Sequence, residues 1–70
     1  MTLQNAVPGT EYFIRNINTD DEELNSFLLS LGCYVGEAIT VISHLKGSCI
    51  ISIKNGRYNI DYQLADAIII

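Results

Sequence analysis

The sequence contains few of the residues that catalysis and metal binding need. Its 70 residues include one histidine, His44, two cysteines, Cys33 and Cys49, and no tryptophan. These three soft ligands are one short of a closed structural zinc site, and no C-x-x-C or H-x-x-x-H spacing is present. No acid, base and nucleophile stand in a pattern typical of an active site. We therefore expect no catalytic residue, no metal site, no cofactor and no enzymatic activity.

Basic residues and long apolar runs are also scarce. Eight carboxylates oppose four basic residues, so the net charge is −4. Binding to nucleic-acid phosphates requires clustered Lys and Arg, and the four here are scattered along the chain. No apolar run approaches the roughly 20 residues of a membrane-spanning helix, and Met1–Asn5 lacks the features of a signal peptide. We expect a cytoplasmic protein with free thiols, no nucleic-acid partner and no direct membrane insertion.

What the sequence does have is a high apolar content, 49% of its residues. Such a composition indicates a folded core and excludes a disordered chain, and the length suits a single domain over residues 1–70.

Residues 21–31 are predicted to form a helix, with Thr19 or Asp20 as its N-cap because a Glu stands three residues after each. Gly32 is suited to end that helix. One helical face carries apolar residues at i, i+3, i+4 and i+7: Leu24, Phe27, Leu28 and Leu31.

The remaining sequence predicts five strands. Runs rich in β-branched and aromatic residues place them at 11–16, at 38–42 or as far as 45, at 49–54, after the Asn55-Gly56 turn, and at 67–70. We expect the chain to bend at Ile17. Asn55-Gly56 is typical of a two-residue type I′ hairpin turn, which would pair Ile53 with Tyr58 and Ile51 with Ile60. Residues 61–66 are predicted to form one helical turn. The fold class is therefore mostly β, a small bent sheet or partly open barrel with the helix over one opening.

The loop Cys33-Tyr34-Val35 is the candidate partner-binding segment. It lies between two glycines, and an aromatic residue on a short rigid loop is suited to anchor a partner protein. The alternative is that Tyr34 folds back onto the end of the helix. Cys33 is expected to be partly exposed in this loop, Cys49 to be a small core residue, and His44 to be solvated near a strand end.

The combined motifs resemble the ferrous iron transport protein A family, FeoA. The matching segments are Leu28-x-x-Leu31-Gly32, Gly36-x-x-Ile39-x-Val41 and the closing Leu64-Ala65-x-x-Ile68-x-Ile70. The resemblance implies an SH3-like barrel, with one helix inserted between the first two strands and a short helical turn before the last. It also implies a small cytoplasmic accessory protein of ferrous iron uptake that binds the cytosolic part of the FeoB permease.

A second interpretation of the sequence assigns the protein to a different functional class. The SH3-like fold also occurs in iron-dependent repressors, which implies a metal-responsive sensor or a protein-interaction domain as the alternative. A sensor would use Cys33, His44 or the acidic run Asp20–Glu23. Helix capping and solubility account for that acidic run without any metal.

Overall fold

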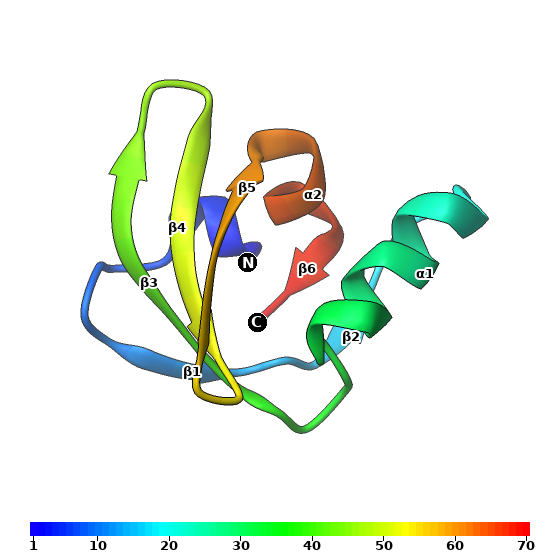
Figure 1. Ribbon diagram of the computed structural model, residues 1–70, viewed down its shortest axis with the longest axis horizontal. Coiled ribbons are helices and arrows are strands. Elements are labelled where there is room, and N and C mark those ends of the chain that lie inside the picture. The colour runs from blue at the N-terminus through cyan, green and yellow to red at the C-terminus, as the bar shows by residue number, and fades with distance from the viewer.

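The computed structural model describes residues 1–70, which form two antiparallel sheets, two α-helices and one turn of 3-10 helix (Figure 1). A four-stranded sheet has the order β1-β3-β4-β5, and a two-stranded sheet pairs β2 with β6. The elements are η1 (Leu3–Asn5), β1 (Glu11–Phe13), β2 (Asn16–Ile17), α1 (Glu22–Leu31), β3 (Ala38–Leu45), β4 (Ser48–Ile53), β5 (Gly56–Asp61), α2 (Tyr62–Ala67) and β6 (Ile68–Ile69). The predicted mostly β class is confirmed, but the two sheets do not close into a barrel.

The first predicted strand, 11–16, is in fact two strands. The backbone N–H of Ile14 donates to the carbonyl of Glu37, beside β3, whereas that of Arg15 donates to Ile69 in β6. Adjacent residues therefore bond to different sheets, and the chain passes from one sheet to the other at this point. Ile17 lies in β2, opposite Ile68, and not at the expected bend.

The N-cap of helix α1 is neither of the two predicted residues, because it lies one residue after Asp20 and two after Thr19. Asp21 is the N-cap, and its Oδ1 accepts hydrogen bonds from the N–H groups of Glu23 at 3.0 Å and Leu24 at 3.2 Å. At the other end Gly32 has φ +99°, as predicted for the residue that ends the helix. Gly32 N–H donates to Leu29 and Cys33 N–H donates to Leu28, which together form a Schellman motif.

The predicted β4–β5 turn is wrong by one residue. Lys54 and Asn55 have φ of +46° and +66°, so they form the two-residue turn, and Ile51 pairs with Tyr58 instead of Ile60. Gly56 is a glycine for another reason: a Cβ there would lie 2.5 Å from Oη of Tyr58. The shift changes the pairing by two residues, so the same side chains still face the core.

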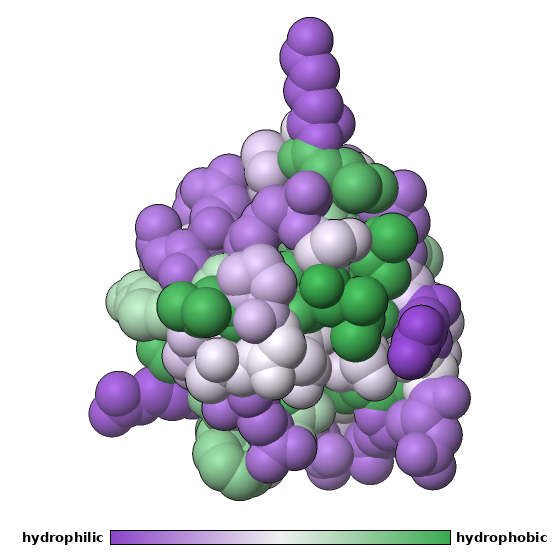
Figure 2. Space-filling view, turned by 90° about the vertical axis from the view of Figure 1, so that its left-hand side faces the viewer, coloured by the Kyte–Doolittle hydropathy of each residue, from purple (hydrophilic) through white to green (hydrophobic).

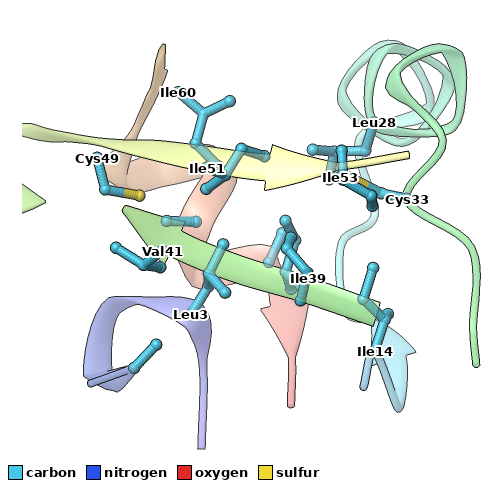
Figure 3. Packing of buried hydrophobic residues seen from close by; sticks show 14 residues of the cluster. Leu3, Ile14, Leu28, Cys33, Ile39, Val41, Cys49, Ile51, Ile53 and Ile60 are labelled. Atoms are coloured by element: carbon cyan, nitrogen blue, oxygen red, sulfur yellow. The ribbon is translucent and has the colours of Figure 1, made fainter. Parts of the chain in front are cut away.

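The core is one cluster of buried apolar side chains enclosed by both sheets, η1 and α2 (Figure 3). Ile39 and Val41 of β3 face inward together, as predicted, and β4 alternates buried and half-buried residues from Cys49 to Ile53. Asp61 is the N-cap of α2, and its Oδ1 accepts a hydrogen bond from the N–H of Leu64 at 2.9 Å. Helix α1 lies to one side of the sheets and contributes one fully buried side chain, Leu28.

Candidate docking loop

The loop between α1 and β3 presents two apolar side chains to solvent. Tyr34 is 48% exposed and Val35 is 65% exposed, whereas Cys33 is fully buried. The expectation that Cys33 is partly exposed is therefore wrong. Cys33 follows the left-handed glycine of the Schellman motif, a position whose side chain turns inward toward the last helical turn. Figure 3 shows Cys33 beside Leu28 and Ile53.

Backbone hydrogen bonds hold this loop in one conformation. Glu37 N–H donates to the Tyr34 carbonyl at 3.0 Å, and Gly36, with φ +91°, occupies the third position of that turn. A positive φ at this position is the requirement of a type II turn. Gly36 N–H also donates to the Ile14 carbonyl at 2.7 Å, which ties the turn to the end of β1. Val35 consequently stands at the tip of a fixed turn.

Lys54, from the β4–β5 turn, lies over the same loop. Its Nζ is 3.1 Å from Oε1 of Glu37 and 5.6 Å from the centroid of the Tyr34 ring. The aliphatic part of the side chain crosses Gly32, where a Cβ would lie 2.7 Å from Lys54 Cδ. Since both charged groups are partly exposed, the ion pair contributes less than about 1 kcal/mol to stability. The ion pair instead fixes the position of the Lys54 ammonium group, which lies over the half-exposed Tyr34 ring.

The residues that sequence reasoning considered for metal binding do not come together. Cys33 and Cys49 are both buried and free, and burial raises the pKa of Cys33 to about 11 and also raises the pKa of Cys49. His44 is not solvated as expected: its Nε2 lies 2.8 Å from the Ala6 carbonyl and the contact is part-buried. Because a carbonyl only accepts, Nε2 carries the hydrogen. Asp21 of the acidic run caps α1.

No group of three His, Cys, Asp or Glu side chains is arranged to hold a metal ion, and the surface has no pocket. None of the helices is long and apolar enough to span a bilayer. Cys49 is a core residue, as predicted.

The bent sheets, the inserted helix and the loop define a small SH3-like domain that offers a surface rather than a pocket. The family model of the FeoA domain matches residues 1–70, and the chain therefore belongs to the FeoA domain family. No curated protein matches the chain.

Solved structures of this family are similar throughout the chain. A crystal structure of an iron uptake regulatory protein, FeoA, has a TM-score of 0.83 and 28% identity, covering 97% of this chain and 92% of that one. Stenotrophomonas maltophilia FeoA complexed with zinc, described as a prokaryotic SH3 domain protein, has a TM-score of 0.86 and 15% identity, covering 99% and 87%. At that identity the second likeness shows the fold alone.

The same fold is part of a longer protein of another kind. A manganese-dependent transcriptional repressor has a TM-score of 0.89 and 17% identity over 97% of this chain. This chain spans 39% of that repressor, and the likeness shows only the fold that the two share.

Proposed function

We propose that this FeoA-family chain is a cytoplasmic accessory protein of ferrous iron uptake that binds the cytosolic part of an FeoB-type permease. Tyr34 and Val35 are the central contacts in this proposal. Membership of the FeoA domain family supports the iron-transport role. The observation that supports this loop as the contact is an exposed aromatic–aliphatic pair on a turn that backbone hydrogen bonds already fix.

The loop has the properties of an interaction hot spot. Aromatic side chains dominate binding energy at protein interfaces, and a loop already fixed in one conformation loses little entropy when a partner binds. Lys54 extends the surface with a positive charge that is already held beside Tyr34. Cys33 supports the loop from beneath and makes no contact with the partner, because its side chain is fully buried.

The test compares two aromatic truncations in binding to the purified cytosolic domain of the permease. Tyr34→Ala removes the proposed anchor, and Phe27→Ala is the matched control, because both rings are 48% exposed. We expect Tyr34→Ala to weaken binding about tenfold or more, the loss typical of a hot-spot aromatic, while Phe27→Ala leaves it within about twofold of the original. Circular dichroism verifies that both variants are folded.

Two results would contradict the proposal. If the unaltered protein shows no binding with or without guanine nucleotide, the permease is not the partner. If Tyr34→Ala and Phe27→Ala weaken binding equally, the permease is bound through a different surface.

A further inference from the structure

The outer face of the four-stranded sheet carries a row of residues that ends in opposite charges. Glu11 pairs with Thr40, Thr40 with Ser52, and Ser52 with Arg57. Directly opposed residues of antiparallel strands lie on the same face, and this face is opposite to the one that buries Ile51. Strands lie about 4.8 Å apart, so the row is about 14 Å long. Glu11 and Arg57 at its ends are both exposed.

An apolar pair lies beside this row. A β-bulge in β3 shifts the register between Val41 and Ser43, so that Ile42 and Ser43 together oppose Ile50 of β4. Ile42 is 38% exposed as a result, and Ile50 is half-buried next to it. Figure 2 shows the side of the molecule along which β3 runs, where apolar and near-neutral atoms lie across the middle among hydrophilic ones.

This arrangement is complementary to itself. Consider a two-fold axis that runs parallel to the strands, between β3 and β4, with the outer faces of two copies in contact. Rotation about it reverses the order of the strands and keeps each position along them. Glu11 of one copy then lies opposite Arg57 of the other, Thr40 opposite Ser52, and Ile42 opposite Ile50. Every contact occurs twice, as in an isologous interface, and the strands of the two sheets are aligned, a common packing of sheets.

We propose that the occupant of this face is a second copy of this chain. The charges favour the axis parallel to the strands. An in-plane axis perpendicular to the strands would place Glu11 opposite Glu11 and Arg57 opposite Arg57, so that like charges would repel each other. The dimer is weak: the row and the isoleucine pair cover far less than the roughly 800 Å² per partner of a stable interface. Each copy also has a net charge of −4, which opposes association. We expect a dissociation constant of about 0.1–1 mM.

Sedimentation equilibrium up to about 1 mM protein tests this proposal. Glu11→Arg should weaken the dimer about fivefold or more, because two symmetry-related ion pairs are replaced by two repulsive ones. Arg57→Glu should weaken it similarly, and the two substitutions combined should restore it.

Glu22→Arg, at the exposed start of α1, is the control, because it changes the net charge as Glu11→Arg does. If general repulsion alone governed association, both variants would dimerise more tightly than the original. A chain that stays monomeric at every concentration overturns the proposal, as does a tighter Glu11→Arg dimer or a doubly substituted chain that fails to recover. The outcome is independent of permease binding, which uses the α1–β3 loop.

Discussion

Replacement of Gly32 by alanine tests how the loop between α1 and β3 is held in its conformation. Gly32 has φ +99°, a conformation that costs a residue with a Cβ about 1–2 kcal/mol. The new Cβ would also lie 2.7 Å from Lys54 Cδ. That side chain is flexible and can move, but it would leave Glu37 and the Tyr34 ring, contacts that together contribute about 1 kcal/mol. Gly32→Ala should therefore lower the free energy of unfolding by about 2–3 kcal/mol.

Gly36→Ala is the matched control, since Gly36 has φ +91° and a Cβ added there would meet no atom within 4 Å beyond its chain neighbours. It should cost only the backbone term, about 1–2 kcal/mol. Urea unfolding measures both values, and a difference of about 1 kcal/mol corresponds to about 4–8 °C in the melting temperature of a domain this small. In a Lys54→Ala background the additional cost of Gly32→Ala should disappear. A Gly32→Ala variant within about 0.5 kcal/mol of the original, or an additional cost that persists without Lys54, would refute the reasoning.

Two further predictions concern the cap of α1 and the buried thiols. Asp21→Ala should lower the free energy of unfolding by about 1 kcal/mol in urea titrations, whereas Asp20→Ala, beside it and outside the cap hydrogen bonds, should change it by less than half as much; equal effects would contradict the assignment of the cap. Burial raises the pKa of Cys33 from 9.0 to about 11, so the folded state retains the proton more strongly than the unfolded state. The contribution of this thiol is complete below its ordinary pKa and decreases as the pH rises toward 11, by at most about 1.4 kcal/mol per pH unit. Urea midpoints from about pH 8 to about pH 10 should decrease less steeply in Cys33→Ala than in the unaltered protein, and identical slopes would contradict the burial of the thiol.

Local patterns in the sequence predicted most of the fold. The apolar stripe of α1 was predicted only in part, because Leu28 is buried whereas Phe27 is 48% exposed. The helix, the glycine that ends it and the inward face of β3 all depend on residues close together in the chain. The division of the first predicted strand into two depends instead on distant residues. The backbone N–H groups of Ile14 and Arg15 donate to carbonyls that are more than twenty residues away in the sequence and belong to different sheet regions. No propensity of the segment itself indicates that division.

The β4–β5 hairpin shows how a local rule can fail with little consequence. Asn55-Gly56 favours a turn, yet Lys54 and Asn55 form it, and Gly56 lies in the strand, where a Cβ would collide with Oη of Tyr58. Turn preferences contain no information about that packing. Side chains alternate with a period of two, so a change of two in the pairing left the predicted core face intact.

The candidate site was only partly accessible from the sequence. Burial of Cys33 could have been inferred, because the residue after a left-handed helix-ending glycine commonly contacts the last turn of the helix. The contact of Lys54 with the loop could not have been inferred from the sequence, because twenty residues separate Lys54 from Tyr34. The turn that brings Lys54 over the loop was also predicted one residue too late.

The central claim is that this domain acts by docking through the α1–β3 loop. Titration of the isotope-labelled chain with the cytosolic domain of the permease, followed by amide chemical shifts, tests it most directly. We expect the largest changes at Tyr34, Val35 and Lys54, with the acidic start of α1 unaffected. No change at any residue, or changes confined to surfaces away from that loop, would contradict the claim.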